Sequence, residues 1–177
     1  MAYTDPTTRA NGFVVGATEW NADIVQNIKF LADPPRCSAY RSSDLSIVTA
    51  TETILTLNAE HWDTNSMHST SVDAGRFVAP VAGIYDVKLS VFFAQATTGY
   101  RQARIYKNGV GVDLETEATN DNPSASTTTS LVCQKEISLL ALEYVECSVF
   151  HTRGSNLSVL GSGSRNTYCQ VRMVSQA

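Results

Sequence analysis

The sequence is short of charged residues and of long apolar runs, and each shortage excludes a class of protein. Asp, Glu, Lys and Arg together make up 17% of the 177 residues, below the roughly 25% of an ordinary soluble protein. Thirteen basic residues against seventeen acidic ones leave a net charge of −4. Lys and Arg form no cluster, which argues against nucleic acid as a partner, since phosphate binding needs one. The nearest basic pair, Arg101 and Arg104, is interpreted as part of a solvated face.

No stretch approaches the ~18 apolar residues of a membrane span, so no membrane partner is expected. The first residues lack the basic start and apolar run of a secretion signal. We therefore expect synthesis in a host cytoplasm without export by the usual route.

The four cysteines show no CxxC spacing, which excludes a zinc ribbon and a thioredoxin-like motif. Cys147 and Cys169 fall on the apolar phase of alternating segments, which predicts buried, reduced thiols that behave as small hydrophobic groups. The alternative is a disulfide that forms after release from the cytoplasm.

Groups suited to catalysis are also scarce, so we predict no enzyme and no cofactor. The three histidines are His61, His68 and His151, and no G-x-S-x-G elbow accompanies them. Alternating acids at Asp113, Glu115 and Glu117 are interpreted as a solvated face, because they lack the glycine and the spacing of a calcium loop. No metal site is predicted, and a cation at Asp86 is kept only as a minor alternative.

The N-terminal 35 residues carry the only helical pattern. Residues 1–16 are polar and read as an extended arm, and a helix over 18–32 follows, with Thr18 as its N-cap. Its apolar positions recur at helical spacing, at Trp20, Ile24, Ile28 and Leu31. The prolines at 34 and 35 end it. A helix this short is marginal alone, so the stripe needs a partner protein, a sister helix or the chain's own head.

From residue 36 onward the pattern is that of an all-β domain. Strands are predicted at 53–57, 76–80, 84–93, 100–106, 127–140, 144–151 and 167–174. In the clearest of them, alternate residues from Tyr85 to Phe93 are apolar, and Asp86, Lys88 and Ser90 point to the other face. Asn108-Gly109 predicts a two-residue hairpin turn. Short strands at this spacing indicate a sandwich or barrel. The predicted domains are thus an anchor, 1–35, and a head, 36–177.

A motif at the start of the central strand resembles the complement-type globular heads, which share a jelly roll with tumour necrosis factors. It consists of Gly75, Phe77, Pro80, Gly83 and Tyr85 in the spacing G-x-F-x-x-P-x-x-G-x-Y. Residues 104–109 resemble the family's "NG" hairpin, and residues 142–149 resemble its late "GD-x-V" strand, with Leu142-Glu143 in place of glycine and aspartate. The resemblance implies a jelly-roll β-sandwich that assembles as a homotrimer.

The same resemblance places Asp86, Lys88 and Ser90 as candidates for the three-fold axis. The family often has aromatic or apolar residues at these positions. Charged residues there could instead pair around the axis, which would specify the assembly more than stabilise it.

The N-terminal segment carries a second resemblance, to small tailed-phage virion proteins. It lies in residues 17–21 (ATEWN), residues 27–31 (NIKFL) and the proline pair that follows. We therefore predict a trimeric virion structural protein, a capsid decoration or short head fibre, whose N-terminal arm binds capsid or other virion proteins. One alternative is the receptor-binding tip of a tail fibre that recognises host glycan or protein. His61, Trp62 and Asp63 are then a candidate ligand loop, because an exposed tryptophan stacks on sugars or fills a protein pocket. A secreted complement-like or cytokine-like ligand is the third alternative.

Overall fold

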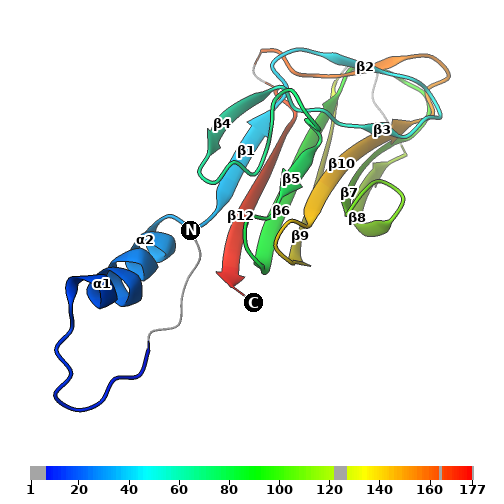
Figure 1. Ribbon diagram of the computed structural model, residues 1–177. Helices are drawn as coiled ribbons and strands as arrows, with labels where there is room; N and C mark the ends of the chain where they lie inside the picture. Colours follow the sequence, from blue (N-terminus) through cyan, green and yellow to red (C-terminus); the bar gives the residue numbers. More distant parts are fainter. Residues whose placement is uncertain (1–6, 122–126, 164, 177) are drawn as a thin grey trace.

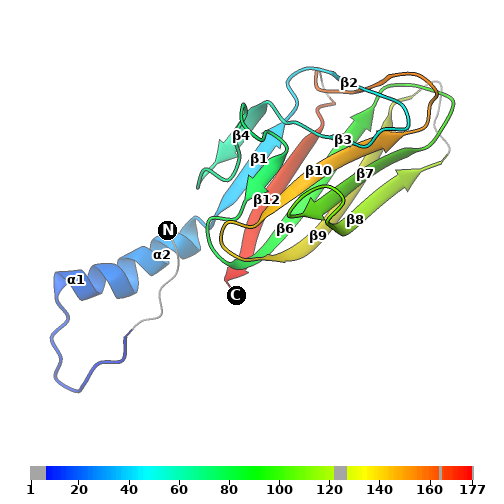
Figure 2. The same cartoon turned by 45° about the vertical axis from the view of Figure 1, so that its right-hand side comes forward.

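The computed structural model describes residues 7–121, 127–163 and 165–176. Two antiparallel sheets face each other, and a helical segment projects from one end of this sandwich, beside the C-terminus (Figure 1). Figure 2 shows the same arrangement from a second side, with the helix again leading away from the sheets. Among the described residues, no helix has the length and apolar character needed to cross a bilayer.

The helical segment is continuous and is followed directly by twelve described strands. It consists of α1 (Ala17–Trp20), a π-helical stretch η1 (Asn21–Val25) and α2 (Gln26–Ala32). The strands are β1 (Arg36–Tyr40), β2 (Leu45–Ile47), β3 (Thr53–Ile54), β4 (Ala59–Asp63), β5 (Arg76–Val78), β6 (Gly83–Phe93), β7 (Arg101–Lys107), β8 (Asp113–Asn120), β9 (Thr129–Leu139), β10 (Tyr144–His151), β11 (Leu157–Val159) and β12 (Tyr168–Gln176).

The strands divide into a seven-stranded sheet A and a five-stranded sheet B. Sheet A has the order β2-β11-β6-β12-β1-β4, and β9 pairs with β6 as well. Sheet B has the order β3-β10-β7-β8, and β5 pairs with β10. Because β9 and β12 both pair with Gly83–Ser90, they lie on opposite sides of β6, which is therefore the centre of sheet A.

The core lies between the sheets, and β6 shows why the sequence folds this way. Its residues at alternate positions from Tyr85 to Phe93 are fully buried, as the period-two pattern predicts. β10 supplies the facing residues from sheet B, with Val145, Cys147 and Val149 also fully buried. At ~25 cal/mol per Å² of apolar surface, side chains of this size each contribute roughly 1.5–3 kcal/mol on burial.

Strand prediction is accurate where a strand is long and alternating, and it fails where a strand is short or polar. The strand at 144–151 is found with those bounds, and that at 84–93 differs by one residue. Strands β1, β2, β4, β8 and β11 lie outside the predicted strand ranges. β2 and β11 have three residues each, and β4 is mostly polar and exposed. Such segments form strands because the neighbouring strand supplies the ladder.

Two local predictions are wrong. Thr18 is not the N-cap, because the helix begins at Ala17 after Gly16, and no side chain caps it. The Asn108-Gly109 turn is not a two-residue hairpin, because Lys107 pairs with Asp113 and residues 108–112 form a longer loop. Asn108 and Gly109 do have the expected positive φ, 57° and 124°. The helix does end before the prolines, at Ala32.

Candidate interaction site

The outward face of sheet A is the first candidate site, and the central strand β6 positions its middle. Asp86 and Lys88 alternate with the buried residues of β6, so their side chains leave the sheet away from the core. Asp86 lies opposite Glu136 on β9 and Arg172 on β12. Its carboxylate accepts a hydrogen bond from Gln134 Nε2 at 2.8 Å.

A shallow polar hollow of about 380 Å³ lies on this face. It is lined by Arg36, Trp62, Asp86, Lys88, Gln134, Gln170 and Arg172. Arg36 pairs with Asp33 at 3.1 Å, and its guanidinium lies 5.5 Å from the centre of the Trp62 ring. Among the described residues, no acidic side chain lies within 4.0 Å of the Lys88 ammonium or the Arg172 guanidinium. The lining therefore contains three cations and one carboxylate, and two of the cations, Lys88 and Arg172, form no ion pair among the described residues.

Ser90, the third predicted axis residue, differs from the other two. It is only 3% exposed, although it has the same phase on β6 as Asp86 and Lys88. Its neighbours across the ladder are Tyr168 and Val132. Of the three candidates, Asp86 and Lys88 are the ones that another molecule can reach.

The predicted ligand loop at 61–63 is a strand, which corrects its placement. His61, Trp62 and Asp63 end β4, next to β1. Their roles are separate: His61 stacks on Tyr40 with ring centres 4.3 Å apart, and Trp62 is 40% exposed beside the hollow.

Asp63 shapes the chain that follows β4. Its carboxylate accepts hydrogen bonds from the backbone N–H groups of Asn65, Met67 and His68 at 2.9–3.1 Å. This is the contact pattern of a residue that holds a turn, because a short acidic side chain satisfies nearby backbone donors. Asp63 is thus engaged in the turn, whereas His61 and Trp62 are both exposed.

The motif that carries the family resemblance is structural. Phe77 and Tyr85 are fully buried, and the Tyr85 hydroxyl donates to the Val81 carbonyl at 2.7 Å. A Cβ on Gly83 would lie 2.5 Å from the Ser175 carbonyl oxygen, and one on Gly75 would lie 2.4 Å from Ile54 Cγ2. The two glycines therefore let neighbouring segments pack close. Pro80 follows β5, in the turn that leads to β6.

The turn where the sequence departs from the family pattern contains a left-handed residue. Leu142 has φ 72°, a left-handed conformation that glycine would adopt without strain, and its side chain is 79% exposed. Glu143 Oε2 pairs with Lys107 Nζ at 2.7 Å and accepts from the Leu140 N–H at 2.8 Å. Its other oxygen accepts from Asn108 Nδ2 at 2.9 Å. These contacts lower the pKa of Glu143 to about 2, and the hydrogen bond from Lys107 has the largest effect.

The N-terminal segment is the second candidate site. Its predicted stripe is exposed in the single chain: Trp20 is 54% exposed, Ile24 37%, Ile28 59% and Leu31 70%. In the preceding arm, Val14 and Val15 are exposed as well. Arg9 pairs with Asp23 at 3.2 Å and lies over the Phe13 ring, so the arm folds back on the helix.

Phe30, which the sequence interpretation missed, joins the helix to the head. It is 7% exposed and belongs to the core, whereas the predicted stripe does not. It lies off the stripe, and its one signal in the sequence is a large aromatic side chain one turn before the prolines. Beyond it, the Met173 N–H donates to the Pro35 carbonyl at 2.8 Å, which ties the start of β1 to β12.

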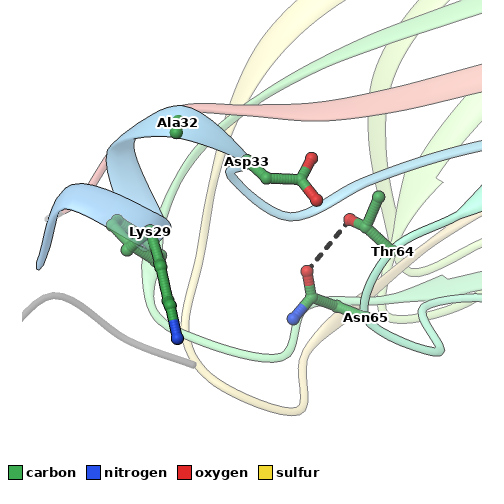
Figure 3. Close-up of a pocket in the computed structure, with 6 residues that line it drawn as sticks. Lys29, Ala32, Asp33, Thr64 and Asn65 are labelled. Carbon is green, nitrogen blue, oxygen red and sulfur yellow. Dashed lines mark hydrogen bonds between the residues drawn. The ribbon is translucent and has the colours of Figure 1, made fainter. Parts of the chain in front are cut away.

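A hollow of about 540 Å³ separates the end of the helix from the turn after β4. Figure 3 shows Lys29, Ala32 and Asp33 on the helix side of this hollow, with Thr64 and Asn65 across from them. The Thr64 hydroxyl donates to Asn65 Oδ1 at 3.0 Å, and the Arg36 N–H donates to Thr64 Oγ1 at 3.1 Å. Phe30 lines this hollow as well, so its walls combine polar groups with an apolar ring.

Two further groups differ from their sequence interpretation. Arg101 is fully buried rather than solvated, and its Nη1 donates to the carbonyls of Thr98, Gly99 and Tyr100. Arg104 is half-buried between Glu52 at 2.9 Å and Glu117 at 3.2 Å.

The histidines have structural partners. His68 Nδ1 lies 2.8 Å from Glu60 Oε1, and its Nε2 lies 3.1 Å from the Ala74 carbonyl oxygen. His151 is fully buried, which lowers its pKa, and it faces the Ile47 carbonyl. Within the described part of the chain, no group of three or more His, Cys, Asp or Glu residues is arranged to hold a metal ion.

Comparisons with solved structures identify the fold. The globular domain of zebrafish complement 1qA protein superposes with a TM-score of 0.57 at 15% identity, covering 81% of this chain and 99% of its own. The head is a jelly-roll β-sandwich. The Eiger tumour necrosis factor of S. frugiperda gives 0.56 at 11% identity (81% and 95% covered), and murine APRIL gives 0.57 at 9% (78% and 99%).

The jelly-roll prediction from the Gly75–Tyr85 motif is thereby confirmed. No protein-family profile matches the sequence, and a search of curated proteins found no relative. At these identities the similarity establishes the fold alone.

Proposed function

We propose that the chain is a trimeric structural protein of a virion, a capsid decoration or short head fibre, with its N-terminal segment as the anchor. The observation that carries the proposal is the exposed apolar stripe on a helix that projects from a closed β-sandwich. The virion location comes from the resemblance of residues 17–35 to small tailed-phage virion proteins. The trimer comes from the jelly-roll head, which resembles complement-type heads. No chemical step is involved, and the protein acts by binding neighbouring subunits.

The exposed stripe supports an anchoring role, because apolar side chains in contact with water cost free energy that binding to a partner would recover. Trp20, Ile28 and Leu31 are each more than half exposed on one short segment, whereas exposed large apolar groups on ordinary surfaces are scattered. A helix of this length is also too short to be stable without burial. Three such segments on one trimer would bind a particle with the combined affinity of three weak contacts.

The charged face of sheet A supports a trimer around that face. Lys88 and Arg172 lack acidic partners within the described chain, and Glu136 lies in the same row as Asp86 and Arg172. When three copies place this face toward one axis, unlike charges from different copies can pair. Such pairs set register and partner choice more than they add affinity.

The anchoring role can be tested by cross-linking and mass spectrometry on purified particles of the virus that encodes the chain. Cross-links from Lys29 to a capsid protein are expected. Cross-links from Lys29 to tail components alone would contradict the decoration.

A matched pair of variants then tests the stripe itself. The double change Ile24→Asp and Ile28→Asp should abolish incorporation into particles, because it puts charges on the docking surface. Ala22→Asp adds a charge at an exposed helix position outside the stripe and should be incorporated normally. Equal incorporation of the double variant would reject the stripe as the anchor.

Trp62 favours a second candidate function, recognition of a host glycan. It is 40% exposed beside a polar hollow that contains Gln134 and Gln170, a combination of ring face and hydrogen-bonding groups that suits a sugar. A glycan array probed with the full chain and with Trp62→Ala tests it. Specific binding lost in the variant favours a receptor-binding tip, and absence of binding favours decoration.

A further inference from the structure

We propose that Cys147 and Cys169 are a latent disulfide pair that links the two sheets when the chain folds under oxidising conditions. Cys147 lies on β10 of sheet B, and Cys169 lies on β12 of sheet A. Both side chains point into the core and are fully buried. Their sulfur atoms are 3.6 Å apart. This inference is independent of the proposed function.

Formation of the bond requires the two sulfur atoms to move closer together. A disulfide has a sulfur–sulfur distance of about 2.05 Å, so the two sulfurs must approach by roughly 1.5 Å. Facing sheets of a sandwich are the right distance apart for such a bond, because immunoglobulin domains have one between their two sheets.

The other two cysteines lie near the same pair. Cys133 interacts electrostatically with Cys147 and Cys169, and Cys37 interacts with Cys169. Cys133 Sγ lies 3.8 Å from the Ala103 carbonyl oxygen, and Cys37 is on β1 beside Asp63 of β4. They are therefore suitable controls, since all four thiols are buried in the same domain.

The reaction is two thiol–disulfide exchanges with a small disulfide such as oxidised glutathione. The thiolate of one cysteine attacks the glutathione disulfide and releases one glutathione thiolate, leaving a mixed disulfide. The second cysteine thiolate attacks the protein sulfur of that mixed disulfide and releases the other glutathione. The two protons from the cysteine thiols end on the two glutathiones, and the two electrons reduce the glutathione disulfide.

Burial determines when this can happen. Burial raises the pKa of the Cys169 thiol, which removes the reactive thiolate, and it also blocks access of the oxidant. The bond should therefore form during folding or local opening and slowly in the native protein. Once closed, the same burial protects it from reductants.

The test is refolding of the full chain with a mixture of reduced and oxidised glutathione, followed by alkylation under denaturing conditions and peptide mapping. Two alkylated cysteines and a peptide linking Cys147 to Cys169 are expected. The linked protein should melt roughly 5–15 °C above the reduced protein, because the bond closes a loop of 22 residues. Native protein in the same buffer should form the link more slowly.

Variants make the test specific. The double variant Cys37→Ala and Cys133→Ala should keep the shift in melting temperature between oxidised and reduced forms, and Cys147→Ala should lose it. Four alkylated cysteines after oxidative refolding, or a link to Cys37 or Cys133, would overturn the proposal. The peptide map of the wild-type chain decides this even if a variant fails to fold.

Discussion

At the scale of single residues, the turn before β10 contains a non-glycine residue in a left-handed conformation. The resembling family has glycine and aspartate there, and this chain has Leu142 and Glu143. The backbone at Leu142 nevertheless has φ 72°. Glu143 makes the hydrogen bonds that hold the turn. A left-handed conformation costs a residue with a side chain roughly 1–2 kcal/mol, so the turn stores strain.

Leu142→Gly should therefore stabilise the protein. Glycine removes the backbone strain but makes the unfolded chain more flexible. The free energy of unfolding is therefore expected to rise by up to about 1 kcal/mol. The exposed leucine side chain contributes little packing that would be lost. Urea denaturation of both proteins measures the difference, with Ala141→Gly as the control, which should be neutral or destabilising. A free energy of unfolding lower than that of the wild type for Leu142→Gly would show that the backbone at Leu142 is not strained.

Glu143 predicts a specific dependence of stability on pH. Its folded-state pKa is about 2, below the usual value of 4.5, so its carboxylate stabilises the fold fully above about pH 4.5. That contribution is lost as pH falls from about 4.5 toward 2. Glu143→Gln should melt at a lower temperature than the wild type at pH 7. The gap between the two melting curves should shrink across that window, and a gap that is constant with pH would refute the assignment.

The burial of Arg101 could not be predicted from the sequence. Nothing in the sequence distinguishes it from Arg104, three residues away on the same strand, yet one is fully buried and the other is paired near the surface. The difference arises because residues 98–100 turn their carbonyls toward Arg101. Such contacts depend on loop conformation, which a linear pattern does not contain.

At the scale of elements, β6 and β10 could be predicted and β4 could not. The first two are long and have buried apolar residues at alternate positions, so that period two is visible in the sequence, although β10 also buries Glu146 and Ser148. β4 is polar, and it forms because β1 lies beside it and because Asp63 fixes the turn that follows. The helix also has one predictable and one unpredictable feature. Its helical spacing of apolar residues predicts the stripe. Its contact with the head is made by Phe30, and this contact depends on where the chain turns into β1.

Gly83 makes the pairing of β6 with β12 testable. A Cβ there would meet the Ser175 carbonyl oxygen at 2.5 Å, a backbone atom that cannot move without disturbing the irregular ladder between Met173 and Ser175. Gly83→Ala should therefore cost roughly 1–3 kcal/mol of folding free energy. Gly75→Ala meets the Ile54 side chain, which can rotate, and should cost less. Chemical denaturation of both variants decides the order, and an equal or reversed order would be inconsistent with the close backbone approach.

At the scale of the whole molecule, the protein combines a β-sandwich with two surfaces that have no partner within the described part of the single chain. One is the apolar stripe of the helix, and the other is the positively charged hollow around Lys88 and Arg172. The sequence motif was enough to predict the jelly roll. The hollow could not be predicted, because it brings together residues from β1, β4, β6, β9 and β12, whose order in sheet A is not apparent in the chain.

Reversing one charge in the hollow tests its role in assembly. Arg172→Glu should weaken the proposed trimer, because it removes a cation from the face that the proposal places at the interface, and added salt should reduce the difference from the wild type. Arg153→Glu makes the same change in a loop that follows β10, outside the hollow, and should leave the mass unchanged. The solution mass as a function of concentration measures both. Equal dissociation of the two variants would exclude the face as the interface.

The central claim, a trimer, is tested most directly by the solution mass of the full chain from light scattering. The account predicts a mass of three times 19.2 kDa at micromolar concentration. A mass of 19.2 kDa under the same conditions would contradict it.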